Sequence, residues 1–222
     1  PTYMLATHTL TTHTMATHTL TTHTMATHTR TTHTMATLLT TTSGTIAASD
    51  WLRSVPDFEL ADQNGNPHSL ASYRNRDFIV FYVQGVGCPI ARIATPSYRE
   101  TRAEFSDKNV EFLMFNSNIQ DNPARIAKEA EEFKIDFPIL KDTDQELAKA
   151  LGVERTAEVF IINPKTKDVL YRGPINDQLG YETQRNHANS HFLKDSLNTV
   201  LQGGIANIED IPDSKGCLVA IF

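Results

Sequence analysis

The chain has 222 residues, of which 40% are hydrophobic and 21% charged, and its formal net charge at pH 7 is −6. This acidic excess argues against a nucleic-acid partner or an anionic membrane surface, since no basic surplus exists to neutralise phosphates. Two cysteines are too few for a secreted disulfide scaffold but suffice for one redox pair, and no stretch of the sequence approaches the roughly 20 apolar residues of a transmembrane helix.

The chain begins with a Thr- and His-rich repeat of ten residues. Six histidines recur in it every five residues, at His8, His13, His18, His23, His28 and His33. This spacing gathers the imidazoles on no single face of a helix or strand. Such tracts can bind copper, zinc or nickel, but the composition favours a disordered leader over residues 1–49. The segment gives no convincing signal peptide, although Ala47-Ala48-Ser49 resembles a cleavage site.

Strand and helix patterns alternate over residues 50–204, which predicts one α/β domain. We expect strands at 55–60, 78–84, 109–116, 137–140, 158–163 and 168–172. Helices are expected at 69–73, 89–105, 122–133 and 144–151, followed by a last one that Ser190 caps and that ends at 203–204. Asn122 and Pro123 are typical of a helix start, and Gly152 of a helix end. The last two strands form an antiparallel pair, so we predict a central mixed sheet covered on both faces.

The turn after the strand at 78–84 has the features of a reactive site. Gly85 and Gly87 break the buried strand, and Cys88 and Pro89 then open a helix, where proline is tolerated in the first turn. The Cys88 sulfur would lie at the positive end of the helix dipole, which favours the thiolate and lowers the pKa of a cysteine. The alternative is that Cys88 is a small buried hydrophobic residue without chemistry.

Several motifs occur in an order typical of one family. They are Val55-Pro-Asp-Phe, Gly65, Ser69-Leu70, the strand-to-cysteine turn and Phe160-Ile-Ile-Asn-Pro. Together they resemble the thioredoxin-like redoxin group, which includes the AhpC/TSA (peroxiredoxin-like) proteins. The resemblance spans residues 50–204 and implies a thioredoxin-like fold.

Three motifs near the C-terminus are similar to a narrower subgroup. They are Tyr171-Arg-Gly-Pro-Ile-Asn-Asp-Gln178, His191-Phe-Leu and Lys215-Gly-Cys-Leu-Val219. They resemble redoxin domains found beside or fused to c-type cytochromes. The resemblance implies an extracytoplasmic setting and a redox partner, either a c-type cytochrome or a small thiol or protein reductant.

The same resemblance implies roles for individual positions. Pro96 follows Cys88 by eight residues, as the helix-kinking proline of a thioredoxin follows its attacking cysteine, and the second cysteine of that motif would fall at Ala91. A peroxiredoxin would carry Thr or Ser at Gly85, and the cis-proline of the thioredoxin-like group would fall at Ala157. A cis bond before alanine costs about 3 kcal/mol more than a trans bond, so we expect this peptide to be trans.

Cys217 lies in a C-terminal extension, residues 205–222, and is the candidate to resolve Cys88. The alternative is that Cys217 is an inert packed residue. Arg92, one turn into the helix, is a candidate to support the thiolate, and Glu158 a candidate to shuttle protons. A solvated helix face and a polar strand start would explain Arg92 and Glu158 equally well.

We therefore predict a thiol-dependent oxidoreductase whose Cys88 attacks a disulfide or, less favoured, a peroxide. Two alternatives stay open: a non-catalytic thioredoxin-fold interaction domain, which Ala91 and Ala157 favour, and a copper-handling module beside an electron-transfer partner. We assign no cofactor and no metal ligand. His187 and His191 are expected to have capping and packing roles, because nothing else completes a ligand set.

Overall fold

The computed structural model describes residues 54–180, 184–207 and 210–222, so the predicted leader at 1–49 lies outside the described residues. The elements follow in the order β1 Glu59–Ala61, β2 Pro67–Ser69, a 3-10 helix η1 Leu70–Tyr73, β3 Phe78–Val83, α1 Pro89–Glu104, β4 Val110–Asn116, α2 Pro123–Glu132, β5 Ile139–Lys141, α3 Glu146–Leu151, β6 Val159–Ile162, β7 Val169–Gly173 and α4 Phe192–Leu201. Within these residues, no helix has the length and apolar character needed to span a membrane.

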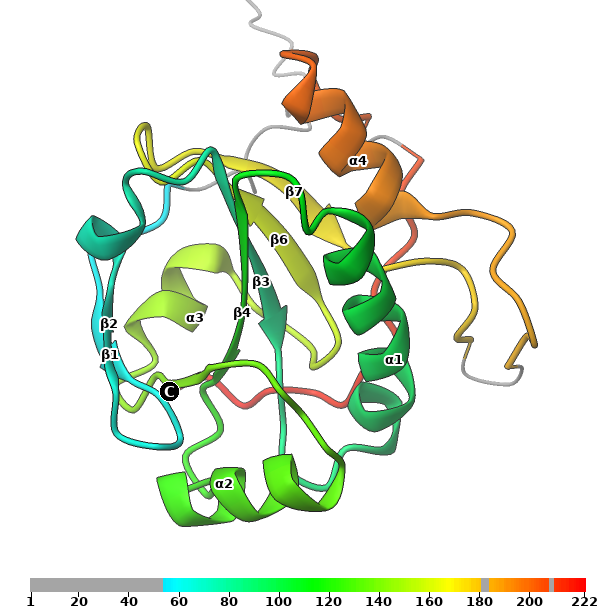
Figure 1. The fold of residues 1–222 in the computed structure, drawn as a ribbon. Coiled ribbons are helices and arrows are strands. Elements are labelled where there is room, and N and C mark those ends of the chain that lie inside the picture. Colours follow the sequence, from blue (N-terminus) through cyan, green and yellow to red (C-terminus); the bar gives the residue numbers. More distant parts are fainter. Residues whose placement is uncertain (1–53, 181–183, 208–209) are drawn as a thin grey trace, which may run out of the picture. The chain divides into compact units, whose positions relative to one another are not determined.

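Five strands form a mixed sheet in the order β5-β4-β3-β6-β7 (Figure 1). The first three are parallel to one another, whereas β6 is antiparallel to β3, and β7 is antiparallel to β6. The parallel strands read as continuous apolar runs because both of their faces are buried. The mixed sheet flanked by helices confirms the predicted thioredoxin-like fold, and it places β3, which leads to Cys88, at the centre.

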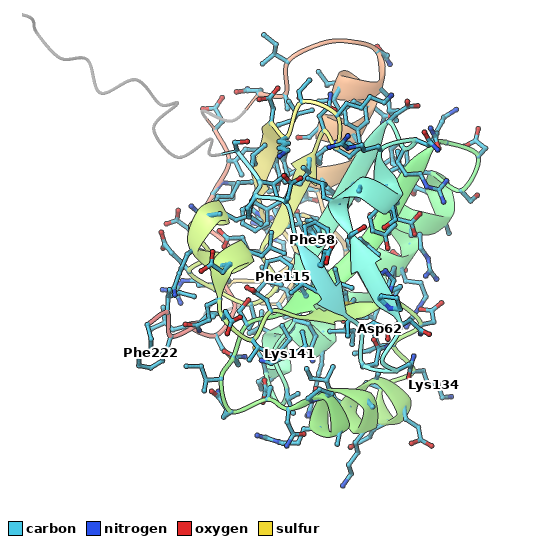
Figure 2. All side chains as sticks on the ribbon, turned by 90° about the vertical axis from the view of Figure 1, so that its left-hand side faces the viewer. Phe58, Asp62, Phe115, Lys134, Lys141 and Phe222 are labelled. Atoms are coloured by element: carbon cyan, nitrogen blue, oxygen red, sulfur yellow. The ribbon has the colours of Figure 1, made fainter. Side chains whose placement is uncertain are left out.

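Alternate residues of β3 point to two separate hydrophobic clusters. Tyr82 belongs to the cluster that also contains residues of α1 and α4, and Phe81 to the cluster on the opposite face, which contains residues of α3. Figure 1 shows α1 and α4 on one side of the sheet and α3 with the β1–β2 hairpin on the other. On that second side, Phe81 packs edge-on between Phe58 and Phe115, which Figure 2 labels, with ring centroids 5.8 and 5.5 Å away.

The local helix signals are confirmed at several ends. The side chain of Asn122 accepts a hydrogen bond from the backbone N–H of Arg125 at 2.9 Å and caps α2, which begins at Pro123. Gly152 ends α3 with a left-handed φ of 63°, a conformation that glycine adopts without steric cost. Ser69 caps the 3-10 helix.

Two boundaries were predicted wrongly. Helix α4 begins at Phe192 with His191 as its N-cap, so Ser190 is not the cap; its N–H instead donates to Asp177 Oδ1 at 3.0 Å. The strand predicted at 55–60 is in strand conformation only from Glu59 onward. Pro56 has no N–H to give to a sheet, which explains why regular pairing starts after it.

Tyr98 gives a test of how α1 is fixed to the sheet. Its side chain is fully buried, and its hydroxyl lies 2.9 Å from the carbonyl oxygens of Val80 on β3 and Leu113 on β4. We expect Tyr98→Phe to lower the free energy of unfolding by about 1–2 kcal/mol, because a buried donor is lost while the ring is kept. Urea denaturation measures this, and an unchanged midpoint with an unchanged slope would contradict it.

Candidate active site

Cys88 occupies the N-cap of α1, as the sequence predicted. Pro89 is the first residue of the helix, and Gly87 before it has a φ of 79° that favours glycine. The sulfur therefore lies at the end of the helix where backbone N–H groups have no partner within the helix. Cys88 is only 4% exposed, so a negative charge on its sulfur requires donors from the protein itself.

Two buried carboxylates hold the turn that precedes Cys88. Asp121 accepts a hydrogen bond from the N–H of Val86 at 3.0 Å, and Glu129 on α2 accepts one from the N–H of Gly87 at 3.2 Å. Sequence analysis missed both acids, because they lie 35 and 42 residues beyond the groups they bind. No local pattern in the sequence connects them with the turn.

Arg92 acts on this turn through Glu129. Its guanidinium donates to both carboxylate oxygens, with distances of 2.8 Å from Nε and 2.6 Å from Nη2, and it lies over the ring of Phe133. The pKa of Arg92 is raised, first by the hydrogen bond to Glu129 and to a smaller extent by the charge of Cys88. Arg92 thus interacts electrostatically with the Cys88 thiolate, but its side-chain hydrogen bonds are made to Glu129.

The C-terminal extension brings Cys217 to Cys88. The backbone of Cys217 makes two hydrogen bonds of 2.9 Å to Thr156: its carbonyl accepts from the N–H, and its own N–H donates to Oγ1. Thr156 Oγ1 also lies 3.0 Å from the Cys88 sulfur, so this one side chain contacts both cysteines. Figure 1 shows the C-terminal segment, in red, crossing the sheet at the end from which α1 starts.

A glycine allows this close approach. A Cβ on Gly216 would lie 1.7 Å from the carbonyl oxygen of Thr156, which is far inside van der Waals contact. Beyond Cys217 the pairing continues, with the N–H of Val219 donating to the carbonyl of Glu154 at 2.9 Å. The extension is therefore held in register beside residues 154–156, in the manner of a short antiparallel strand.

A second anchor holds the end of the extension. The side chain of Gln145, which is 2% exposed, donates to the carbonyl of Ala220 at 2.7 Å and accepts from the N–H of Phe222 at 2.9 Å. It also donates to the carbonyl of Ser117, in the loop after β4. The extension is fixed on both sides of Val219, whose side chain is buried.

The two cysteines have opposite pKa shifts. Burial raises the pKa of Cys88, but hydrogen bonds from the Cys217 thiol and from Thr156 outweigh it, and the N–H groups of Ala91 and Cys217 act in the same direction, so the net pKa is lowered. The pKa of Cys217 is raised to about 11 by partial desolvation, by its hydrogen bond to Cys88 and by the charge of Cys88. Cys88 is therefore the stronger acid of the pair and loses its proton before Cys217.

Glu158 lies near the site but bonds in another direction. It is 5% exposed; its Oε1 accepts from Nε of Arg172 at 2.7 Å and its Oε2 from the N–H of Glu154 at 3.3 Å. Burial raises the pKa of Glu158, and the charge of Arg172 partly offsets this. The carboxylate is thus engaged in an ion pair that does not include Cys88.

The positions that depart from the family pattern have a structural account. The peptide before Ala157 is trans, as expected, and Ala157 has a φ of 61°, which is unusual for a residue with a side chain. A Cβ at Gly85 would lie 2.7 Å from Cγ2 of Thr156 and 2.9 Å from the amide nitrogen of Asn118, so a threonine or serine does not fit at position 85. Thr156 fills that space, and sequence analysis missed its contact with Cys88.

Gly216 provides a test of the docked extension. We expect Gly216→Ala to displace Cys217 from Cys88 and to slow formation of a Cys88–Cys217 disulfide in a glutathione redox buffer by roughly tenfold or more, because small misplacements of reacting atoms are costly. Thiol mapping by mass spectrometry measures this.

Leu218→Ala is the matched control, since this neighbouring side chain is 73% exposed, and its rate should stay within about twofold of the unchanged protein. A Gly216→Ala rate equal to that of the control would refute the docking role.

Residues 52–169, more than half of the chain, match the AhpC/TSA family. The thiol-disulfide oxidoreductase ResA of Geobacillus thermodenitrificans is 30% identical over 120 residues, which cover 53% of this chain and 67% of the relative. Peroxiredoxin 2 of Caldanaerobacter subterraneus is 28% identical over 124 residues, covering 50% and 55%. The chain thus spans between about half and two thirds of the length of these relatives.

Two solved structures share the fold. A hypothetical protein from Sinorhizobium meliloti has a TM-score of 0.65 and 22% identity, with 76% of this chain and 92% of the other covered. An uncharacterized conserved protein from Geobacillus kaustophilus has a TM-score of 0.63 and 25% identity, with 77% and 92% covered. With a central mixed sheet, a cysteine at the start of α1 and a family match over 52–169, the chain belongs to the AhpC/TSA family.

Proposed function

We propose that the protein is a thiol-dependent oxidoreductase in which Cys88 is the nucleophile and Cys217 the resolving thiol. The observation that carries this proposal is that both cysteines meet at Thr156, whose Oγ1 lies 3.0 Å from the Cys88 sulfur and accepts from the Cys217 N–H at 2.9 Å. The pKa values of the two thiols also move in opposite directions. A thiolate beside a protonated thiol is the arrangement that thiol–disulfide exchange requires, because only the thiolate attacks. The relatives that match this chain include a thiol-disulfide oxidoreductase and a peroxiredoxin.

The first half of the reaction uses Cys88 alone. Its thiolate attacks one sulfur of a substrate disulfide and forms a mixed disulfide, while the other substrate sulfur leaves as a thiolate and takes a proton from solvent. Once Cys88 is bonded, it no longer carries the negative charge that helps to raise the pKa of Cys217. Cys217 then loses its proton more readily.

In the second half, the Cys217 thiolate attacks the Cys88 sulfur and expels the second substrate thiolate. The substrate disulfide has been reduced to two thiols, and the protein has been oxidised to a Cys88–Cys217 disulfide. With a peroxide, Cys88 would become a sulfenic acid and Cys217 would displace water. We favour the disulfide, because Gly85 carries no hydroxyl to orient a peroxide.

A groove beside the site supports a substrate larger than a peroxide. It has a volume of about 610 Å³ and lies between the start of α1 and the segments 174–179 and 210–215. Ile90, two residues after Cys88, and Ala157, next to Thr156, both line it. A groove of this size accommodates a peptide segment or a small organic disulfide.

An external thiol is required to reduce the Cys88–Cys217 disulfide, and the two sulfurs differ in how open they are to its attack. Cys217 is exposed and Cys88 is buried. Attack on Cys217 also expels Cys88, the sulfur with the lowered pKa and hence the better leaving group. We propose that a small thiol or a dithiol protein reduces the enzyme at Cys217. A c-type cytochrome or another redox protein is a further candidate partner, on the subgroup resemblance.

The proposed mechanism requires a thiol from the domain and a second thiol from its C-terminal extension. We propose that residues 50–204 form the redoxin domain and that residues 205–222 are an extension that supplies the second thiol. The hydrogen bonds of the extension to Thr156 and Gln145 support this assignment.

Single cysteine variants test the two-step mechanism. With hydroxyethyl disulfide at neutral pH, we expect the unchanged protein to yield the Cys88–Cys217 disulfide and Cys217→Ser to accumulate a mixed disulfide on Cys88. Cys88→Ser should react more than about tenfold more slowly, because Cys217 is mostly protonated at this pH. Intact mass and peptide mapping give the products. The two-cysteine mechanism is wrong if the unchanged protein never forms the internal disulfide.

The site of reduction has its own test. Oxidised protein is mixed with glutathione, the reaction is quenched with acid at early times, and the modified cysteine is identified by peptide mapping. We expect the glutathione adduct on Cys217, since that sulfur is exposed and its attack releases the more acidic thiol. An adduct found mainly on Cys88 would reverse the assignment.

A further inference from the structure

Neighbouring atoms enclose the side chain of Thr156 and fix the position of its hydroxyl oxygen. The residue is 1% exposed. A Cβ on Gly85 would lie 2.7 Å from its Cγ2, and a Cβ on Gly216 would lie 2.6 Å from its Oγ1. Neither neighbour can carry a side chain while Thr156 keeps its place, so the two glycines and the threonine fit together as one packed unit. The hydroxyl is thereby held between the two cysteines.

The hydrogen bonds at this hydroxyl run in one direction. The N–H of Cys217 can only donate, so Oγ1 is the acceptor of that 2.9 Å bond. The single proton of the hydroxyl is then free to point at the Cys88 sulfur, 3.0 Å away. A thiolate is a charged acceptor, and hydrogen bonds to charged groups are the strong ones. The chain therefore runs from the Cys217 amide through Thr156 to Cys88, and each bond polarises the next.

We propose that Thr156 is a third catalytic residue, whose hydroxyl stabilises the Cys88 thiolate while its oxygen holds the backbone of Cys217 beside it. This inference rests on the proposed function. It extends that function, because one side chain then serves both steps. The hydroxyl stabilises Cys88 as the attacking thiolate, and again as the leaving thiolate when an external thiol reduces Cys217. In the intermediate disulfides Cys88 carries no charge, and Thr156 still keeps the resolving cysteine in place.

The test separates the hydroxyl from the bulk of the side chain. Thr156→Val replaces the hydroxyl by a methyl group of similar size, and Thr156→Ser keeps the hydroxyl and removes the methyl. Both are made in a Cys217→Ser background, which preserves the backbone N–H at 217 and leaves Cys88 as the single cysteine. Thiolate formation is followed by ultraviolet absorbance across pH, and reactivity by the rate of alkylation with iodoacetamide.

We expect Thr156→Val to shift the titration of Cys88 upward and to slow its alkylation at neutral pH by about tenfold, the effect of losing one hydrogen bond to a charged group. Thr156→Ser should stay within about twofold of the background protein. A purely structural role would not move the titration, so a Thr156→Val curve that superimposes on the background curve overturns the proposal. If Thr156→Val does not fold, Thr156→Ala takes its place in the same comparison.

A second measurement covers the bond to Cys217. In the two-cysteine protein, equilibrium with a glutathione redox buffer should show a weaker preference for the internal disulfide in Thr156→Val than in Thr156→Ser. Equal preference in the two variants would contradict the backbone role. The titration needs only Cys88, so it is decided whether or not the internal disulfide forms, and its failure is distinguishable from failure of the proposed function.

Discussion

The hydroxyl of Thr156 joins the C-terminal extension to the start of α1, because its oxygen lies 3.0 Å from the Cys88 sulfur and accepts from the N–H of Cys217 at 2.9 Å. It matters because a charged sulfur that is only 4% exposed has little water to solvate it. The protein supplies the missing donors from three directions: the open N-terminus of the helix, the hydroxyl of Thr156 and the thiol of Cys217. Remove the extension, and two of the contacts that lower the pKa of Cys88 are lost together.

The turn before Cys88 poses an opposite electrostatic problem. Its N–H groups are bound by the carboxylates of Asp121 and Glu129, and negative charges near a thiolate disfavour it. Arg92, on the helix that begins at Cys88, neutralises the charge of Glu129 on α2 through a bidentate ion pair. The side chain that sequence analysis proposed as a support for the thiolate thus lies where it neutralises the acid that shapes the turn.

The sequence predicted those features that depend on residues within one helical turn of each other. Asn122, Pro123 and Gly152 mark helix ends because their side chains or backbone freedom act within one turn, and Gly-Cys-Pro placed Cys88 at a helix start for the same reason. Ser190 was a misleading signal, because its neighbourhood is organised by Asp177.

The rest of the site depends on contacts that sequence spacing does not reveal. Thr156 meets Cys88 across 68 residues and Cys217 across 61. In the sequence, Gly85 and Gly216 look like ordinary turn residues. Only the structure shows that a Cβ at either position would clash with Thr156. The extension was predicted to carry a resolving cysteine, but its docking through Gln145 left no pattern in the sequence.

Ala157, at the position where the family resemblance places a cis-proline, has a backbone conformation that proline cannot adopt. Its φ of 61° lies on the opposite side of the conformational map from the roughly −65° that a proline ring demands, and its N–H donates to the carbonyl of Val83 at 2.8 Å, a bond that proline has no proton to make. An Ala157→Pro substitution would therefore meet both a forbidden dihedral and a lost hydrogen bond to β3. The loop that carries Thr156 therefore excludes proline at position 157 for as long as its backbone keeps this conformation.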